Sequence, residues 1–405
     1  MSLFTAVELA PRDPILGLNE QFNADPNPAK VNLGVGVYFD EAGKLPLLAC
    51  VQAAEQQLTD ARKPRGYLPI DGIAAYDKAV QRLVFGADSP LLTAGRVATV
   101  QALGGTGGLK LGADFLKKIK PGASVLISDP SWENHRALFS NAGFPVSSYA
   151  YYDAEQRGVR FDAMLADLRA AAAGSIVVLH ACCHNPTGYD LAPDQWQQVI
   201  DVVSARGLIP FLDLAYQGFG DGIAEDGAVV QQCLAAGVPS LFVATSFSKS
   251  FSLYGERVGA LSVVCSSADD CARVLSQLKI TIRTNYSNPP THGAQVVATV
   301  LDTPALRAQW EEELAGMRQR IQQMRSLLLS KLDARLLAAG IAQDFSFITR
   351  QRGMFSYSGL SAAQMQRLRS EFGIYGVDSG RICVAALNTR NIDPVVDAMA
   401  RVIQG

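Results

Sequence analysis

A lysine lies in a hydroxyl-rich segment directly after an apolar run. The segment 245–257, TSFSKSFSLYGER, follows the run 241–244, LFVA, and contains Lys249. At the end of a buried strand the ammonium form of a lysine is disfavoured, so its pKa falls and the free amine can condense with an aldehyde. Ser246, Ser248 and Arg257 offer the donors that a phosphate group needs. The alternative is a solvated lysine in a serine-rich loop.

A glycine-rich segment, residues 103–108, follows another apolar run and precedes a helical pattern over residues 109–117. Glycines allow backbone N–H groups to approach an anion, and the positive end of a helix stabilises it. The segment lacks both the Walker lysine and the dinucleotide glycine spacing. An ordinary strand-to-helix turn is the alternative.

Two further apolar runs end in polar side chains. Asn185 belongs to the segment 182–188, CCHNPTG, in which Pro186 restricts the backbone before it. Asp213 ends the run 209–214, and Tyr216 follows three residues later. A carboxylate in such an apolar setting needs a cation. A plain turn at Asn185, and a helix cap or buried ion pair at Asp213, remain possible.

The four segments together fit the needs of pyridoxal phosphate. Open α/β sheets bind ligands at the carboxyl ends of their strands, where all four segments lie. The glycine-rich turn and Arg257 suit the phosphate, and Asp213 suits the pyridinium nitrogen. Tyr216 and Asn185 suit the ring oxygen, and Lys249 suits the aldehyde.

Hydrophobic patterning predicts the elements that position these groups. Short, nearly continuous apolar runs predict buried strands of a mostly parallel sheet, at residues 97–102, 124–128, 176–181, 209–214, 241–245 and 259–264. Residues 302–339 form a long amphipathic stretch whose apolar side chains repeat at helical spacing and should pack in a core: Trp310, Leu314, Met317, Ile321, Met324 and Leu328. Strands at 345–348, 354–357 and 381–386, with helices from Ser361 and Asp393, predict a smaller α+β domain.

Composition narrows the class of protein. The 405 residues suffice for two domains, and a formal net charge of −2 argues against nucleic acid or an anionic membrane as a partner. The seven cysteines form no C-x-x-C pair, so we expect no metal site, no disulfide framework and a reducing cytoplasm. The sequence shows neither a signal-peptide pattern nor an apolar run long enough for a membrane span.

Over nearly its whole length the sequence resembles the aspartate and aromatic amino acid aminotransferases, which are class I pyridoxal phosphate enzymes of fold type I. The matching stretches are NLGVGVY (32–38), GYLPIDG (66–72), GGTGG (104–108), DPSWENH (129–135), CCHNPTG (182–188), DLAYQGFG (213–220), SFSKSFSLYGERVG (246–259), RTNYSNPP (283–290) and SGRICVAALN (379–388). The resemblance implies a large, mostly parallel α/β/α domain at 46–316. It also implies a smaller α+β domain at 15–45 and 317–405, and an N-terminal arm at 1–14.

The resemblance also implies roles at the cofactor. Lys249 would hold the cofactor covalently and then move the proton, Asp213 would keep the ring nitrogen protonated, and Tyr216 and Asn185 would hold the ring oxygen. Trp132 would cover the ring, and His135 and His180 would support it from behind. The phosphate would be bound by Gly105, Thr106, Ser246 and Arg257, and by Tyr67 of the neighbouring subunit.

The substrate residues implied by the resemblance are few. Arg381 would grip the α-carboxylate through two parallel contacts. Arg283 would reach across a homodimer with shared active sites to a side-chain carboxylate, Gly36 would lie in a segment that closes over substrate, and Trp132 and Asn185 would lie beside it. The residues of several motifs are more similar to those of the bacterial aromatic amino acid aminotransferases. This resemblance implies transfer of the amino group from phenylalanine, tyrosine and aspartate to 2-oxoglutarate. The alternative is a dedicated aspartate aminotransferase.

Overall fold

The computed structural model describes residues 2–10 and 15–405, which form two compact units. The larger unit comprises Leu45–Gln322 and Arg350–Gly353. The smaller unit comprises Gln323–Thr349, Met354–Gly405 and the described residues before Leu45. The domain boundaries expected from the sequence, at 15–45, 46–316 and 317–405, stay a prediction. Residues 1 and 11–14 of the expected N-terminal arm lie outside the described residues.

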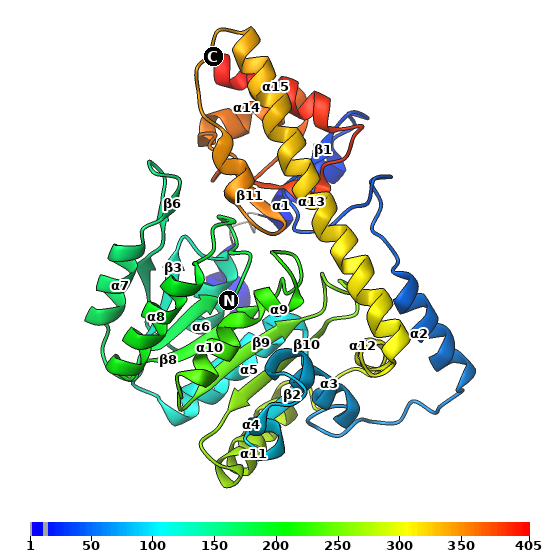
Figure 1. Cartoon of the computed structure of the whole chain (residues 1–405), viewed down its shortest axis with the longest axis vertical. Helices are drawn as coiled ribbons and strands as arrows, with labels where there is room; N and C mark the ends of the chain where they lie inside the picture. The colour runs from blue at the N-terminus through cyan, green and yellow to red at the C-terminus, as the bar shows by residue number, and fades with distance from the viewer. Residues whose placement is uncertain (1, 11–14) are drawn as a thin grey trace. The chain divides into compact units, whose positions relative to one another are not determined.

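A seven-stranded sheet with helices on both faces forms the centre of the larger unit (Figure 1). Its order is β2 (Val97–Leu103), β10 (Val258–Val264), β9 (Leu241–Ser246), β8 (Ile209–Leu214), β7 (Ile176–His180), β3 (Val125–Asp129) and β4 (Val146–Ala150). All neighbours pair in parallel except β10, which is antiparallel to both β2 and β9. The mostly parallel sheet and its six predicted strands are confirmed. The sequence did not reveal β4, an edge strand with one buried residue, Tyr149.

Strand direction gathers the predicted polar segments at one edge of the sheet. Because β10 is antiparallel to both neighbours, the other six strands all run the same way. The carboxyl ends of β2, β3, β7, β8 and β9 therefore share one edge, as does the start of β10. Every segment singled out for its chemistry between residues 103 and 257 begins at this edge.

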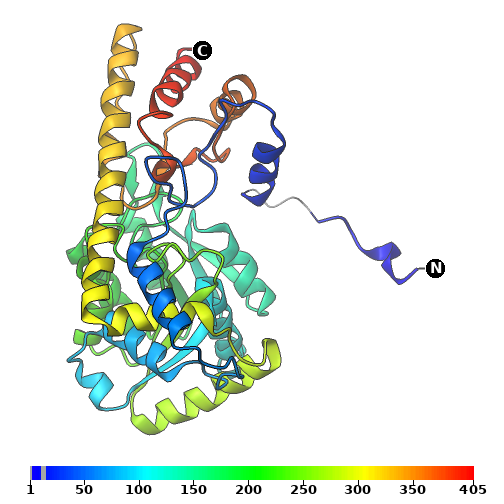
Figure 2. The same ribbon diagram turned by 90° about the vertical axis from the view of Figure 1, so that its right-hand side faces the viewer.

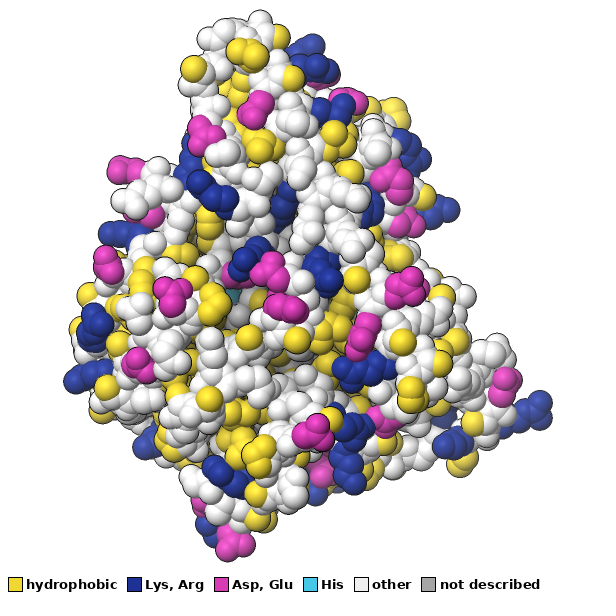
Figure 3. All heavy atoms as spheres, viewed as in Figure 1, with side chains coloured by type: hydrophobic (Ala, Val, Ile, Leu, Met, Phe, Trp, Pro, Cys, Tyr) yellow, Lys and Arg dark blue, Asp and Glu magenta, His cyan; other side chains and the backbone are white. Residues whose placement is uncertain are grey.

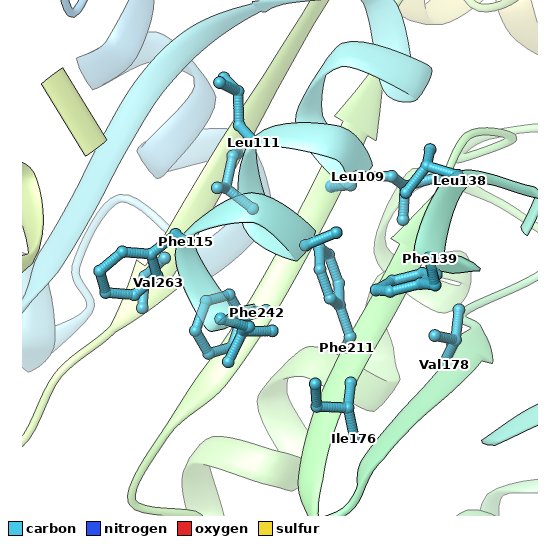
Figure 4. Packing of buried hydrophobic residues seen from close by; sticks show 14 of the residues in the cluster. Leu109, Leu111, Phe115, Leu138, Phe139, Ile176, Val178, Phe211, Phe242 and Val263 are labelled. Carbon is cyan, nitrogen blue, oxygen red and sulfur yellow. The ribbon is translucent and has the colours of Figure 1, made fainter. Parts of the chain in front are cut away.

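The core of the larger unit packs α5 (Gly104–Ile119) and α6 (Glu133–Asn141) against the sheet (Figure 4). Phe211 of β8 is fully buried among Phe139, Phe242 and Leu109. Glycine lets α5 approach closely, since a Cβ on Gly112 would lie 2.4 Å from Phe211 Cζ. The close approach fixes where the amino end of α5 lies.

The remaining elements of the larger unit are mostly helices. They are α2 (Ala49–Asp60), α3 (Ala74–Phe85), α4 (Pro90–Thr93), α7 (Phe161–Ala170), α8 (Pro193–Arg206), α9 (Ile223–Asp226), α10 (Ala228–Ala235), α11 (Ala268–Asn285) and α12 (His292–Asp302), with the short pair β5 (Tyr152–Asp153) and β6 (Gly158–Val159). Helix α13 (Pro304–Ala338) is continuous from the larger unit into the smaller one (Figure 2). Its predicted apolar stripe, Trp310 to Leu328, is buried.

The smaller unit is built from short paired strands and helices. Strand β1 (Val31–Asn32) pairs in parallel with β12 (Ile374–Tyr375), and β11 (Phe355–Tyr357) pairs antiparallel with β13 (Arg381–Cys383). Its helices are α1 (Leu16–Ala24), α14 (Ala362–Phe372) and α15 (Ile392–Gln404), with 3-10 turns at Leu3–Ala6 and Val384–Ala386. The helices predicted from Ser361 and Asp393 are confirmed.

Two strand predictions in this region need correction. The strand expected at 345–348 is wrong, because residues Ser346–Arg350 form a 3-10 helix. Asp344 Oδ1 accepts the backbone N–H of Ser346 at 2.8 Å, a local turn that competes with extended structure. The strand expected at 381–386 ends at Cys383 and is followed by the 3-10 turn Val384–Ala386.

The surface carries no large field of one sign on the face drawn in Figure 3, where acidic and basic side chains are interspersed. No disulfide links the seven cysteines, all of which lie in the described part of the chain. Among the described residues, no helix has the length and hydropathy to span a membrane. Apolar side chains near the N-terminus are largely exposed, including Phe4 at 73 % and Leu9 at 99 %.

Candidate active site

Lys249 lies in the turn that follows β9, three residues after the strand ends at Ser246. Its Nζ is 4.6 Å from the centre of the Tyr216 ring, and the side chain is partly exposed. Burial lowers the pKa of Lys249 to about 8; the Asp213 carboxylate opposes this shift and the Arg257 guanidinium adds to it. At pH 7 about a tenth of the amine is therefore in the free form that a nucleophilic lysine requires, far more than for an ordinary lysine.

Asp213 lies on β8 with His180 of β7 on one side and Ala244 of β9 on the other. It is 6 % exposed, and its Oδ2 is 2.9 Å from His135 Nε2. Its Oδ1 is buried and has no hydrogen-bond partner among the described residues. Burial would raise the pKa of Asp213, but His135, His180 and Lys249 together hold it below its ordinary value. Asp213 is thus a buried anion with one oxygen available to a cationic donor.

Three imidazoles lie behind this carboxylate. His135 also contacts Ser131 Oγ through Nδ1 at 2.9 Å, and its ring centre is 4.9 Å from that of His180. His180 is in turn 4.2 Å from His184. The sequence suggested His135 and His180 as supporting residues, and both belong to this group.

His184 was not expected as part of the group. Its Nε2 is 2.9 Å from Ser128 Oγ, its Nδ1 is 2.8 Å from Thr187 Oγ1, and its ring stacks on Tyr151 at 4.0 Å. The only signal in the sequence was its position beside Asn185, in a segment that follows a buried strand. Burial lowers the pKa of His184 well below its ordinary value, so the ring is neutral.

The glycine-rich turn forms the amino end of α5, which begins at Gly104 and not at residue 109 as the sequence pattern suggested. The backbone N–H of Gly104 donates to the Arg257 carbonyl at 3.0 Å. A Cβ on Gly104 would lie 2.6 Å from Arg257 Nη2, and one on Gly105 would lie 3.1 Å from Ser246 Cβ. Ser246 and Arg257 thus adjoin the first turn of α5, which also contains Thr106. N–H groups, a helix amino end, a hydroxyl and a guanidinium together make an anion site.

Asn185 and Trp132 lie at the ends of neighbouring strands. Asn185 is 5 % exposed in the turn after β7. Asp190 holds that turn by accepting the backbone N–H groups of Cys183 at 2.7 Å and His184 at 2.8 Å. Trp132 directly precedes α6, and its ring meets that of His135 edge-on at 5.2 Å.

Within the smaller unit, Arg381 and Gly36 share one neighbour. The Arg381 guanidinium lies 4.4 Å from the centre of the Phe355 ring and donates to the Gly34 carbonyl at 2.7 Å, and the residue is 2 % exposed. A Cβ on Gly36 would lie 2.6 Å from Phe355 Cζ. Nothing in the sequence indicated that Phe355 would contact both residues.

Tyr67 and Arg283 are exposed on the larger unit. Tyr67 is 96 % exposed. Arg283 lies in the last turn of α11 and donates to Ser287 Oγ. Among the described residues, neither Tyr67 nor Arg283 takes part in the contacts found at Lys249 and Asp213, which involve Tyr216 and His135.

The comparisons with known proteins agree with this geometry. The family described as aminotransferase class I and II matches residues 28–399. An aspartate aminotransferase of Pseudomonas aeruginosa is 64 % identical over 403 residues, covering 100 % of both chains. An aromatic-amino-acid aminotransferase of Escherichia coli is 52 % identical, covering 99 % of this chain and 100 % of the relative.

A solved structure shares the fold. The aromatic-amino-acid aminotransferase of Burkholderia pseudomallei, covalently bound to pyridoxal phosphate, matches with a TM-score of 0.96 and 66 % identity, over 99 % of this chain and 100 % of that one. The predicted fold type I architecture is confirmed by this match. The chain belongs to the class I and II aminotransferase family and is a pyridoxal phosphate-dependent transaminase related to both aspartate and aromatic amino acid aminotransferases.

Proposed function

We propose that the chain transfers the amino group of phenylalanine, tyrosine and aspartate to 2-oxoglutarate in a ping-pong reaction. The main observation behind the proposal is that Lys249 and Asp213 lie at the same edge of the sheet. Lys249 has a lowered pKa, of about 8, and Asp213 is a buried carboxylate with an available oxygen. Amino-group transfer needs an amine that attacks an aldehyde and an anion that stabilises a protonated ring nitrogen.

The residues present fit pyridoxal phosphate. The buried Asp213 Oδ1, which lacks a partner among the described residues, suits a ring N–H. The amino end of α5, with Arg257 and Ser246 beside it, suits a phosphate dianion. When bound, the cofactor withdraws electrons from the α-carbon of the substrate.

The side chains around the cofactor ring would have different roles. Lys249 would bind the aldehyde and, once released by substrate, would carry the proton as general base and acid. Asp213 would keep the ring nitrogen protonated, and His135 orients that carboxylate through its 2.9 Å hydrogen bond. Tyr216 and Asn185 would donate to the ring oxygen.

Several contacts would position cofactor and substrate. The backbone of Gly105 and Thr106, with the side chains of Ser246 and Arg257, would bind the phosphate. Trp132 would cover the ring and exclude water from it.

Arg381 would bind the substrate α-carboxylate, with Gly36 in the segment that closes over substrate. The contact of the Arg381 guanidinium with the Phe355 ring and its hydrogen bond to the Gly34 carbonyl support this role, because they hold the guanidinium in place for a two-point contact.

We propose further that the chain acts as a homodimer in the cytoplasm. The exposed aromatic ring of Tyr67 and the exposed Arg283 would then serve the partner's site, as phosphate donor and as the contact for a side-chain carboxylate. The exposed Phe4 and Leu9 also favour burial against another chain. Sedimentation velocity of the full chain, with and without residues 1–10, would test the dimer.

A dedicated aspartate aminotransferase is the second candidate, and the 64 % identical relative of that name favours it. An amino-donor panel with 2-oxoglutarate separates the two. Comparable kcat/KM values for phenylalanine and aspartate support the dual enzyme, and a phenylalanine value near background overturns it. Replacement of Lys249 by alanine should abolish transamination in either case, and a variant that transaminates normally would refute the proposed role of the lysine.

A further inference from the structure

Two thiols and a carboxylate converge in a buried cluster to which the proposed function gives no role. Cys182 Sγ, Cys183 Sγ and a carboxylate oxygen of Asp226 lie within 4.8 Å of one another. The three residues are 5 %, 2 % and 6 % exposed, respectively. The other group of this kind among the described residues consists of His135, His180 and Asp213.

Backbone conformation brings the two adjacent thiols together. Successive side chains point in opposite directions along an extended strand. Cys183, however, has a left-handed backbone with φ of 51°, three residues after β7 ends. Gly353 packs against it, since a Cβ there would lie 2.4 Å from Cys183 Cβ. The hydrogen bonds that Asp190 accepts from the backbone of Cys183 and His184 hold this conformation.

Asp226 retains capacity for a cation. Its Oδ2 accepts the backbone N–H groups of Gly218 at 2.8 Å and Gly220 at 2.9 Å, and its Oδ1 accepts that of Asp221 at 2.9 Å. A carboxylate has about four acceptor positions, and these three hydrogen bonds use three of them. The carboxylate is therefore held rigidly by backbone and still has a position on Oδ1.

We propose that Cys182, Cys183 and Asp226 form a binding site for a thiophilic divalent cation of the Zn²⁺ and Cd²⁺ class. Sulfur ligands at about 2.3 Å in tetrahedral geometry lie roughly 3.8 Å apart, within reach of a cluster whose ligand atoms are at most 4.8 Å apart. Each thiol releases one proton to solvent as its sulfur binds the cation, and water takes the fourth position. Two thiolates and one carboxylate select a soft cation over Mg²⁺ or Ca²⁺.

The site adjoins two segments of the candidate active site. Cys183 Sγ is 3.9 Å from the carbonyl oxygen of Tyr216, and Asn185 follows two residues later. Binding of the cation shifts both segments and so lowers transaminase activity. That consequence rests on the proposed function, whereas binding itself does not.

The test uses the holoenzyme with Cd²⁺ as the probe. Wild-type protein is incubated with Cd²⁺, passed through a desalting column and assayed for metal by mass spectrometry, and the ultraviolet thiolate-to-cadmium absorption is recorded. We expect one retained Cd²⁺ per chain. Cys182→Ser and Cys183→Ser should each lose it, whereas Cys265→Ser, which removes another buried thiol, should retain it.

The site would be overturned if the wild type retained no Cd²⁺, or if Cys182→Ser and Cys183→Ser retained as much Cd²⁺ as the wild type. Circular dichroism and the visible absorption of the bound cofactor show whether each variant has folded. Should the serine variants not fold, anomalous diffraction from Cd²⁺-treated wild-type crystals decides the question. A peak bonded to both sulfur atoms supports the site, and peaks only elsewhere refute it. A protein that binds Cd²⁺ but transaminates no donor would refute the proposed function alone.

Discussion

Replacing Gly104 by alanine tests the anion site at the amino end of α5. Gly104 has φ of 69°, and a left-handed alanine costs about 1–2 kcal/mol of stability. The added Cβ would lie 2.6 Å from Arg257 Nη2, so the guanidinium must move. A hydrogen bond to a charged group contributes about 1.5–3 kcal/mol, so loss of one should weaken pyridoxal phosphate binding about 10- to 150-fold.

Gly174→Ala provides a matched control. Gly174 also has a left-handed backbone, with φ of 79°, but a Cβ there would have no neighbour within 4 Å. Both variants should therefore lose a similar amount of thermal stability, measured by calorimetry. Only Gly104→Ala should bind the cofactor more weakly when pyridoxal phosphate is titrated into apoenzyme. Pyridoxal without the phosphate should bind the wild type and Gly104→Ala alike.

The proposed phosphate contact of Arg257 would be refuted by a cofactor dissociation constant for Gly104→Ala within about threefold of the wild type, since loss of a charged hydrogen bond predicts a larger change. It would also be refuted if Gly174→Ala weakened cofactor binding equally, because backbone strain would then suffice as the cause. A loss of affinity for pyridoxal as large as that for pyridoxal phosphate would show that the ring site, and not the phosphate site, had been disturbed.

The remaining predictions concern Lys249, Arg283 and Phe211. In the proposed mechanism the free amine of Lys249 is the nucleophile. Because its pKa is about 8, the stopped-flow rate of pyridoxal phosphate attachment to apoenzyme should rise with pH through that value and then level off; a flat profile between pH 6 and 10 would contradict this. Arg283→Leu should lower kcat/KM for aspartate about 10- to 150-fold by removing charge-assisted hydrogen bonds, and should spare phenylalanine; an equal loss for both donors would argue against a side-chain carboxylate contact. Phe211→Ala should lower the free energy of unfolding by about 3–5 kcal/mol in urea titrations, because the side chain is fully buried; a change below about 1 kcal/mol would contradict its place in the core.

The sheet could be predicted from the sequence because its central strands are buried on both faces. Runs such as residues 241–244 are apolar throughout, which is typical of strands covered on both faces. Strand β4 escaped prediction because Ser147 and Ser148 are exposed at the edge of the sheet. The 3-10 helix at Ser346–Arg350 looked like a strand because Phe345, Phe347 and Ile348 are apolar. A local hydrogen bond that the backbone N–H of Ser346 donates to Asp344 favours the turn instead.

The candidate site was predictable only in part. Lys249, Asp213 and Asn185 were identified because each lies in or just after the end of a buried apolar run, and strand direction brings strand ends together. The His184 contacts with Ser128 and Thr187 depend on strand register and on the turn after β7, which no spacing in the sequence encodes. The start of α5 at Gly104 was missed because glycine is a poor helix former, and tertiary packing overrides that preference here.

The neighbouring buried rings of His180 and His184 resist protonation in the folded chain. Burial, with a smaller contribution from His135, lowers the pKa of His180 to about 3, and burial lowers that of His184 as well. Below pH 6.5 these two rings would take up protons in the unfolded chain but not in the folded one, so their contribution to stability falls as the pH falls. At pH 5 the contribution lost at His180 is about 2 kcal/mol, against the 5–15 kcal/mol that typically separates a folded protein from its unfolded state. Mildly acidic purification buffers therefore work against the fold at this pair of rings.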